Sequence, residues 1–390
     1  MFSISRFQRL MQGLPQGGFE RIVQSCEGDK HVKGFSCRNL LVAQVYGQLS
    51  GSRSLREIEA GYNAHASQHY HLGTGPLKRT TLSDASARRN PAVFEATARL
   101  LMGQASRAVR RQSQAGLLLL DSTSFTLKGR GFDEWTQANR TRNTQGVKLH
   151  LVYDPDQAVP VVEGITAANI NDVTWATTLP LRRGATYVFD KGYCDYNWWA
   201  RFNDHQAHFI TRLKINAKIE VLRVEPIPEQ ATGVILADER IILSNKNPGA
   251  GRKNLYTEPL RRVVVARPDH DTPLVLVTND FDRSAQAIAD SYRARWQIEL
   301  FFKWIKQNLR IKQFYGRSEN AVRIQILCAL IAYLLTALYH AASQAGVSLR
   351  RTLDTLRIGM FQRPSTDTAL AQRRRNRLRE QLAVQPGLFT

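Results

Sequence analysis

The chain has 390 residues, 43% of them hydrophobic, so it can bury a large core and is neither a disulfide-stapled miniprotein nor a disordered tail. Its 54 lysines and arginines against 33 acidic residues give a net charge of +21, which predicts a polyanionic partner. The longest apolar run, at 326–339, is shorter than the roughly 20 residues that cross a bilayer and no secretion signal is apparent, so we expect a cytoplasmic protein whose partner is nucleic acid and not a membrane.

Residues 1 to about 112 have the apolar spacing of helices and are predicted to form an all-helical, DNA-binding region. Ser54 and Glu57 fit a capping box, which predicts that a helix begins there. A short helix is expected at Ser83–Arg89, with cations beside small polar residues, as in a helix-turn-helix reader of DNA. The cations are Lys78, Arg79, Arg88 and Arg89. A solvated basic helix without a DNA contact is the alternative.

Beyond residue 116 the pattern becomes that of β-strands. Strands are expected at 117–120, 147–153, 159–165 and 186–190, with a helix at 171–179 before the last of them. Further strands are predicted at 208–213, 234–243, 261–265 and 274–278, and long helices at 284–309 and 318–343. The order predicts an α/β domain over 113–345 with a β-rich insertion at about 208–272, followed by a basic tail over 346–390.

Two carboxylates stand directly after apolar strands, Asp121 in LLLLDSTSF and Asp190 in YVFDKGY. An ionised aspartate is costly to bury, and the carboxyl ends of strands are where α/β folds place their sites. A helix cap or a loop aspartate is the alternative for each one alone. Two such aspartates with this strand order between them favour a functional site.

The helix predicted from Tyr292 to Lys306 offers a third acid, Glu299. At 100° per residue one stripe of this helix holds Tyr292, Arg295, Glu299, Lys303 and Lys306. Three carboxylates would suffice to hold two divalent cations for phosphoryl transfer. A surface ladder of ion pairs is the alternative interpretation of the stripe.

Tyr292-x2-Arg295-x3-Glu299-x6-Lys306 matches every defined position of the Y-x2-R-x3-E-x6-K signature, so the chain resembles the insertion sequence 4 family of DDE transposases. The likeness extends over Asp121, Asp190, the segment VKLHLVYD and the helical N-terminal region, to about residue 345. It implies a DNA transposase with an RNase H-like catalytic domain interrupted by a β-rich insertion.

The resemblance also implies roles for single residues. Asp121, Asp190 and Glu299 would be catalytic and would bind two Mg²⁺ or Mn²⁺ ions. Tyr292, Arg295 and Lys306 would grip phosphates near the element end, with Lys303 in support, and Trp296 would handle a flipped base, unless it is a core aromatic. The partners would be terminal inverted repeats and target DNA, bound by a homodimer in the nucleoid.

Weaker candidates lie outside the signature. His150 either approaches the acids or is satisfied elsewhere. The arm with Lys128, Arg130 and the stretch 139–142 is either a DNA contact or a basic hairpin, and the arginines at 373–379 either bind phosphate or are solvated. Two other functions stay open: a metal-dependent nuclease without strand transfer, and a non-catalytic DNA-binding repressor derived from a transposase. Four cysteines without metal-ligand spacing are expected to be free thiols.

Overall fold

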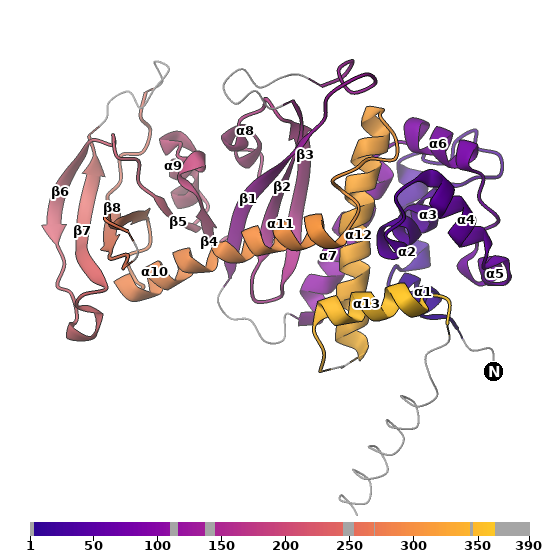
Figure 1. The fold of residues 1–390 in the computed structure, drawn as a ribbon. Helices are drawn as coiled ribbons and strands as arrows, with labels where there is room; N and C mark the ends of the chain where they lie inside the picture. Colours follow the sequence, from indigo (N-terminus) through magenta and orange to yellow (C-terminus); the bar gives the residue numbers. More distant parts are fainter. Residues whose placement is uncertain are drawn as a thin grey trace, which may run out of the picture. The chain divides into compact units, whose positions relative to one another are not determined.

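The computed structural model of the chain describes residues 4–109, 116–136, 145–244, 253–268, 270–343 and 346–362. These residues form two compact units (Figure 1). The first runs to Phe94 and resumes at Leu327, so it joins the two ends of the chain. The second spans Glu95–Ile326 and contains every strand. The stretches 139–142 and 373–379 lie outside the described residues.

The first unit is helical, as the sequence predicted. Its helices are α1 (Arg6–Met11), α2 (Gln16–Ser25), α3 (Cys37–Ser50), α4 (Leu55–Asn63), α5 (His69–Leu72), α6 (Arg79–Arg88), α13 (Leu349–Gly359), the start of α7 (Ala92–Val109) and most of α12 (Glu319–Ser343). Helix α3 is buried along almost its whole length and contacts α4, α6 and α13. The segment that follows residue 346 thus begins with a helix that packs on the N-terminal helices.

Ser54 begins α4 by accepting a hydrogen bond from the backbone N–H of Glu57. The carboxylate of Glu57 reaches back, but it accepts from the N–H of Arg53, one residue before the cap. The predicted helix start is therefore correct, while the reciprocal bond differs by one residue from a regular capping box.

Helix α12 is long and apolar enough to cross a bilayer by length and composition. However, 83% of its most apolar window is buried inside the protein, as in the core helix of a soluble fold. The burial agrees with the prediction of a buried helix. All four cysteines are free thiols, as expected, and Cys37 and Cys328 are buried.

The second unit is built on one nine-stranded sheet with the order β3-β2-β1-β4-β5-β9-β8-β7-β6. Its strands are β1 (Leu117–Thr126), β2 (Gly146–Asp154), β3 (Val159–Ala167), β4 (Thr186–Phe189), β5 (His208–Arg212), β6 (Ile219–Val224), β7 (Ile235–Leu243), β8 (Leu260–Val265) and β9 (Leu274–Thr278). Strands β1, β2 and β3 form an antiparallel meander, and β4 and β5 continue parallel to β1. The β-rich segment extends this same sheet, because β5 pairs with β9.

Helices cover the sheet of the second unit: α8 (Asp172–Ala176), α9 (Tyr196–Asp204), α10 (Ala285–Ala294) and α11 (Trp296–Asn308). Aromatic residues of α9, among them Trp198, Trp199 and Phe202, pack on one face. Helix α11 contacts β1, and α10 contacts β4 and β5. Helix α9 and strand β6 were not predicted from the sequence.

Candidate active site

Asp121 and Asp190 lie beside each other at the end of a parallel strand pair. The pairing of β1 with β4 runs from Leu117 opposite Thr186 to Leu120 opposite Phe189, so each aspartate is the next residue of its strand. The expectation that β1 ends at Asp121 is wrong, because the strand continues to Thr126 in its antiparallel pairing with β2. At Asp121 the pairing of β1 with β4 has therefore ended, while its pairing with β2 continues.

Burial raises the pKa of Asp121 to about 6. A bond from the N–H of Ser122 and the charge of Arg295 act in the opposite direction, whereas the charges of Glu299 and Asp190 raise the pKa further. The charges of the other two predicted acids therefore both act on Asp121. Such mutual repulsion in a half-buried position is the environment in which a cation is stabilised.

The predicted continuous helix from 284 to 309 is interrupted at Arg295, which separates α10 from α11. Arg295 keeps right-handed helical angles, but its N–H bonds to Tyr292 and its carbonyl accepts from Ile298, so the chain tightens locally into 3₁₀-type turns. The Arg295 guanidinium lies next to two of the predicted acids. Its Nη2 lies 2.7 Å from Glu299 Oε1 and its Nη1 lies 3.9 Å from Asp121 Oδ2.

No group of three or more His, Cys, Asp or Glu side chains in the described part of the chain is arranged to hold a metal ion. The chemistry of the three acids nevertheless fits divalent metals such as Mg²⁺ or Mn²⁺, since carboxylate oxygens are their preferred protein ligands. The guanidinium of Arg295 supplies the positive charge between Asp121 and Glu299 and thereby stands in for a cation.

The other members of the predicted stripe differ in exposure. Tyr292 is buried, its ring lies 5.8 Å from the guanidinium of Arg295, and burial raises its pKa to about 12. Lys306 is half-buried, bonds to Thr123 Oγ1 of β1 and lies 5.3 Å from the ring of Phe125, while burial lowers its pKa. Lys303 is exposed.

Trp296 is 58% exposed, so the alternative that it is a core aromatic is wrong. Leu300, one turn farther along α11, is also exposed, at 48%. The first two turns of α11 therefore present an apolar surface next to the Glu299 carboxylate.

A buried polar cluster behind Asp121 was not anticipated as a unit. Asp172 Oδ1 accepts from Ser122 Oγ at 3.0 Å and from Lys148 Nζ at 3.0 Å, and it lies 3.8 Å from His150 Nδ1. His150 is fully buried, bonds through Nε2 to Thr166 Oγ1 and has its pKa lowered to about 4 by burial. His150 therefore lies in the core and not on a solvated face, with Nε2 hydrogen-bonded and Nδ1 buried without a hydrogen-bond partner among the described residues.

The cations predicted for the N-terminal unit are placed on α6 and its ends. Lys78, Arg79 and Arg88 are exposed. Arg89 is half-buried, donates to the carbonyl of Phe35 and lies 3.9 Å from Asp29. Its guanidinium therefore interacts with other residues of the same unit. In the described part of the arm, Arg317 donates to the carbonyl of Arg130.

Comparisons with known proteins agree with this arrangement. Residues 112–335 match the family described as "Transposase DDE domain", and residues 3–75 match a domain of unknown function. A protein of Sinorhizobium fredii named as transposase y4zB is 42% identical over 285 residues, which cover 72% of this chain and 77% of that protein.

A protein of Geobacillus stearothermophilus, named as a transposase for insertion sequence element IS5377, is 29% identical over 79% of this chain and 84% of its own length. The solved piggyBac transposase synaptic complex with hairpin DNA superposes with a TM-score of 0.48 at 10% identity, covering 90% of this chain and 79% of that chain. That TM-score is too low to establish a common fold.

Proposed function

We propose, since the chain belongs to the transposase DDE domain family and is an insertion-sequence DNA transposase, that Asp121, Asp190 and Glu299 are its catalytic acids. The observation that carries the proposal is the placement of Asp121 and Asp190 directly after the paired residues Leu120 and Phe189, with Arg295 joining Asp121 to Glu299. Acids that are distant in the sequence thereby influence one another at the end of one strand pair.

The family depends on divalent metal, and we propose two Mg²⁺ or Mn²⁺ ions for this member. Asp121, Asp190 and Glu299 would hold them. When bound, such ions stabilise the charge on the attacking and leaving oxygens of phosphoryl transfer. The half-buried position of Asp121 and its raised pKa support this assignment, because a carboxylate that is costly to ionise gains most from a cation nearby.

The strand order supports an RNase H-like catalytic domain. The antiparallel meander of β1 to β3 continues into the parallel strands β4 and β5, and both aspartates follow the pairing of β1 with β4. The segment β6 to β9 would then be the β-rich insertion, attached through the pairing of β5 with β9. On this assignment the insertion begins after β5 and not at residue 208.

DNA is the partner of the family, and the +21 charge of the chain suits it. We assign contacts with phosphates near the element end to Arg295, Lys303 and Lys306. Tyr292 would support Arg295, since its ring lies 5.8 Å from the guanidinium. The exposed ring of Trp296 can stack on a base. On α6, the exposed Lys78, Arg79 and Arg88 are proposed phosphate contacts, whereas Arg89 holds α6 in place.

The reaction is cut-and-paste transposition. Water attacks a phosphorus at the element end and the P–O3′ bond breaks, which frees a 3′ hydroxyl. This hydroxyl then attacks a phosphorus of the second DNA segment, and the 3′ oxygen of that segment leaves. Cutting two ends together calls for a homodimer in the synaptic complex. The family indicates a cytoplasmic protein, and its substrate would keep it at the nucleoid.

The test is incubation of the purified chain with Mg²⁺ and duplexes that carry the terminal repeats of its element, followed by denaturing gels. We expect strand-specific nicks at the repeat boundary and joined products with a target plasmid, and neither on a scrambled repeat. Nicks without joined products would indicate a nuclease. Binding without nicks would indicate a repressor.

A further inference from the structure

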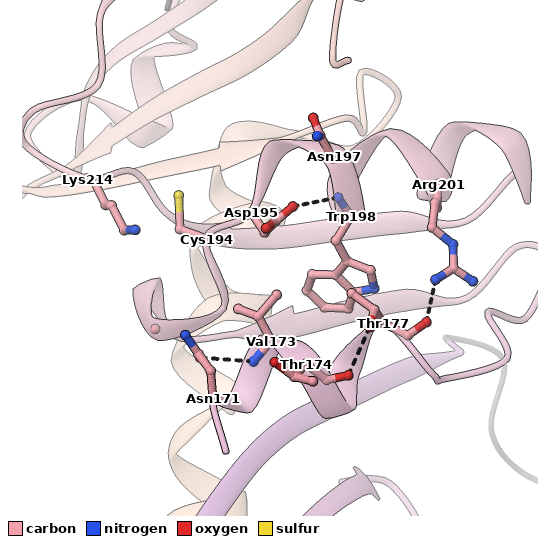
Figure 2. Close-up of a pocket in the computed structure, with 11 residues that line it drawn as sticks. Asn171, Val173, Thr174, Thr177, Cys194, Asp195, Asn197, Trp198, Arg201 and Lys214 are labelled. Atoms are coloured by element: carbon pink, nitrogen blue, oxygen red, sulfur yellow. Dashed lines mark hydrogen bonds between the residues drawn. The ribbon is translucent and has the colours of Figure 1, made fainter. Parts of the chain in front are cut away.

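A pocket of about 650 Å³ lies between α8, α9 and the short turn Lys191–Tyr193 that follows Asp190. Gly192 of that turn lines the pocket. Trp198, Arg201 and Lys214 line it too (Figure 2). The pocket is therefore built from the segment directly after a proposed catalytic acid. None of the roles assigned above uses it.

The lining of the pocket includes two positively charged side chains, Arg201 and Lys214, and one negatively charged side chain, Asp195. Lys214 and Arg201 stand at opposite sides of the pocket (Figure 2). Arg201 donates to the carbonyl of Thr177, which aims its guanidinium along the pocket wall. The acid at the pocket, Asp195, accepts from the backbone N–H of Trp198 and caps α9.

A further donor is unmet at the same place. Trp198 is only 2% exposed, and its indole N–H has no acceptor among the described residues. A buried N–H without a partner is costly, and an oxygen atom from outside the chain would reach it only after a small shift of the indole, because the nitrogen has almost no accessible surface. Two cations and an unmet donor together suit an anion with several oxygens.

The pocket lies on the face of the sheet opposite to α10 and α11. Leu120 and Phe189 pack in one cluster with the aromatic residues of α9. Because successive side chains of a strand point to opposite faces, Asp121 and Asp190 point to the face that α10 and α11 cover. The pocket and the proposed end-gripping cations therefore flank the acids from two sides.

We infer that this pocket binds backbone phosphates of the target DNA while the element end is held by α10 and α11. The inference rests on the proposed function, because strand transfer brings two DNA segments to one set of acids. A phosphodiester offers oxygens to both cations and to a donor N–H, and a backbone contact places no requirement on sequence. The same chemistry exists in the element end, so the experiment must separate the two sources.

The variant to test is the full chain with Lys214→Gln and Arg201→Gln together. Its matched control removes two exposed positive charges elsewhere, through Arg183→Gln and Arg350→Gln. Nicking is measured on a labelled terminal-repeat duplex, and joining is measured with a pre-cut end and increasing concentrations of a supercoiled plasmid. A charge-preserving variant, Lys214→Arg with Arg201→Lys, and a thermal melt of each protein report on folding.

We expect the plasmid concentration for half-maximal joining to rise about tenfold in the double variant, while nicking stays within twofold of wild type. The control should match wild type in both assays, and the charge-preserving variant should recover most of the joining. If the double variant joins as well as the control, the inference is wrong. It is also wrong if nicking falls as much as joining, because the pocket would then bind the element end. If wild-type protein neither nicks nor joins, the proposed function itself fails.

Discussion

Arg295 Nη2 lies 2.7 Å from Glu299 Oε1, and the same guanidinium reaches within 3.9 Å of Asp121. The arginine that the signature assigns to DNA is therefore also the countercharge of two proposed catalytic acids. It is held in this position by the tightened turn between α10 and α11. A phosphate that binds at Arg295 would lie next to both carboxylates.

Arg295→Ala and Lys306→Ala should impair joining more than nicking. Each removes a cation that positions DNA without removing a carboxylate, and displacement of the 3′ hydroxyl by about 1 Å can cost on the order of 100-fold in rate. The measurement is a time course on end DNA labelled on each strand. Arg293→Ala, which removes a more exposed arginine at the end of α10, is the control. If both variants nick and join at wild-type rates, Arg295 and Lys306 form ion pairs on the helix but do not position DNA.

Asp121→Asn should stabilise the protein at neutral pH in the absence of divalent cations. The folded pKa of Asp121 is raised from 3.8 to about 6, so the protonated form favours folding. That contribution is complete below pH 3.8 and is lost as the pH rises through about 6. We expect the variant to gain on the order of 2 kcal/mol in unfolding free energy above pH 7, and nothing below pH 4, in urea titrations. A gain in unfolding free energy that is independent of pH would contradict the raised pKa of Asp121.

Glu163→Gln should show the same sign at a second, distant site. Only 1% of the Glu163 side chain is exposed, and burial raises its pKa from 4.5 to about 7, with the charge of Glu95 adding to the rise and Arg99 opposing it. Stability from this group is present below pH 4.5 and lost through pH 7, so the variant should be the more stable protein at pH 8 by about 2 to 3 kcal/mol. Glu95→Gln serves as the control, with a smaller effect. Equal melting temperatures of wild type and Glu163→Gln at pH 8 would show that ionised Glu163 does not destabilise the folded protein.

Asp172→Ala should be among the most destabilising single changes in the second unit. It leaves the ammonium of Lys148, whose side chain is 8% exposed, without its countercharge, and breaking such a pair costs about 3 to 5 kcal/mol. Adding Lys148→Met should restore much of the loss, because both charges are then absent. Asp204→Ala, at an exposed position, is the matched control. Failure of the second change to restore stability, measured by urea unfolding, would show that Asp172 acts through another contact.

Asp121 and Asp190 could be singled out in the sequence because each directly follows an apolar run with the pattern of a strand, and Glu299 because it lies on a polar stripe of a predicted helix. The register that brings Asp121 next to Asp190 follows from the parallel pairing of β1 with β4, which a single sequence does not specify. Lys148 and His150 alternate with apolar residues as on a solvated face, yet both are buried. Lys148 donates to Asp172, and His150 bonds to Thr166, partners that the alternation does not reveal. The interruption at Arg295 escaped detection since the residue keeps helical angles.

Catalysis with bound DNA tests the central claim most directly. Asp121→Asn, Asp190→Asn and Glu299→Gln are each compared with wild type for retention of the terminal-repeat duplex in gel shifts and for nicking in Mg²⁺. We predict that all three variants bind the repeat within about threefold of wild type and that nicking falls by at least about 1,000-fold, because each loses a proposed metal ligand but no phosphate contact. Nicking near the wild-type rate by any one variant would remove that residue from the catalytic site.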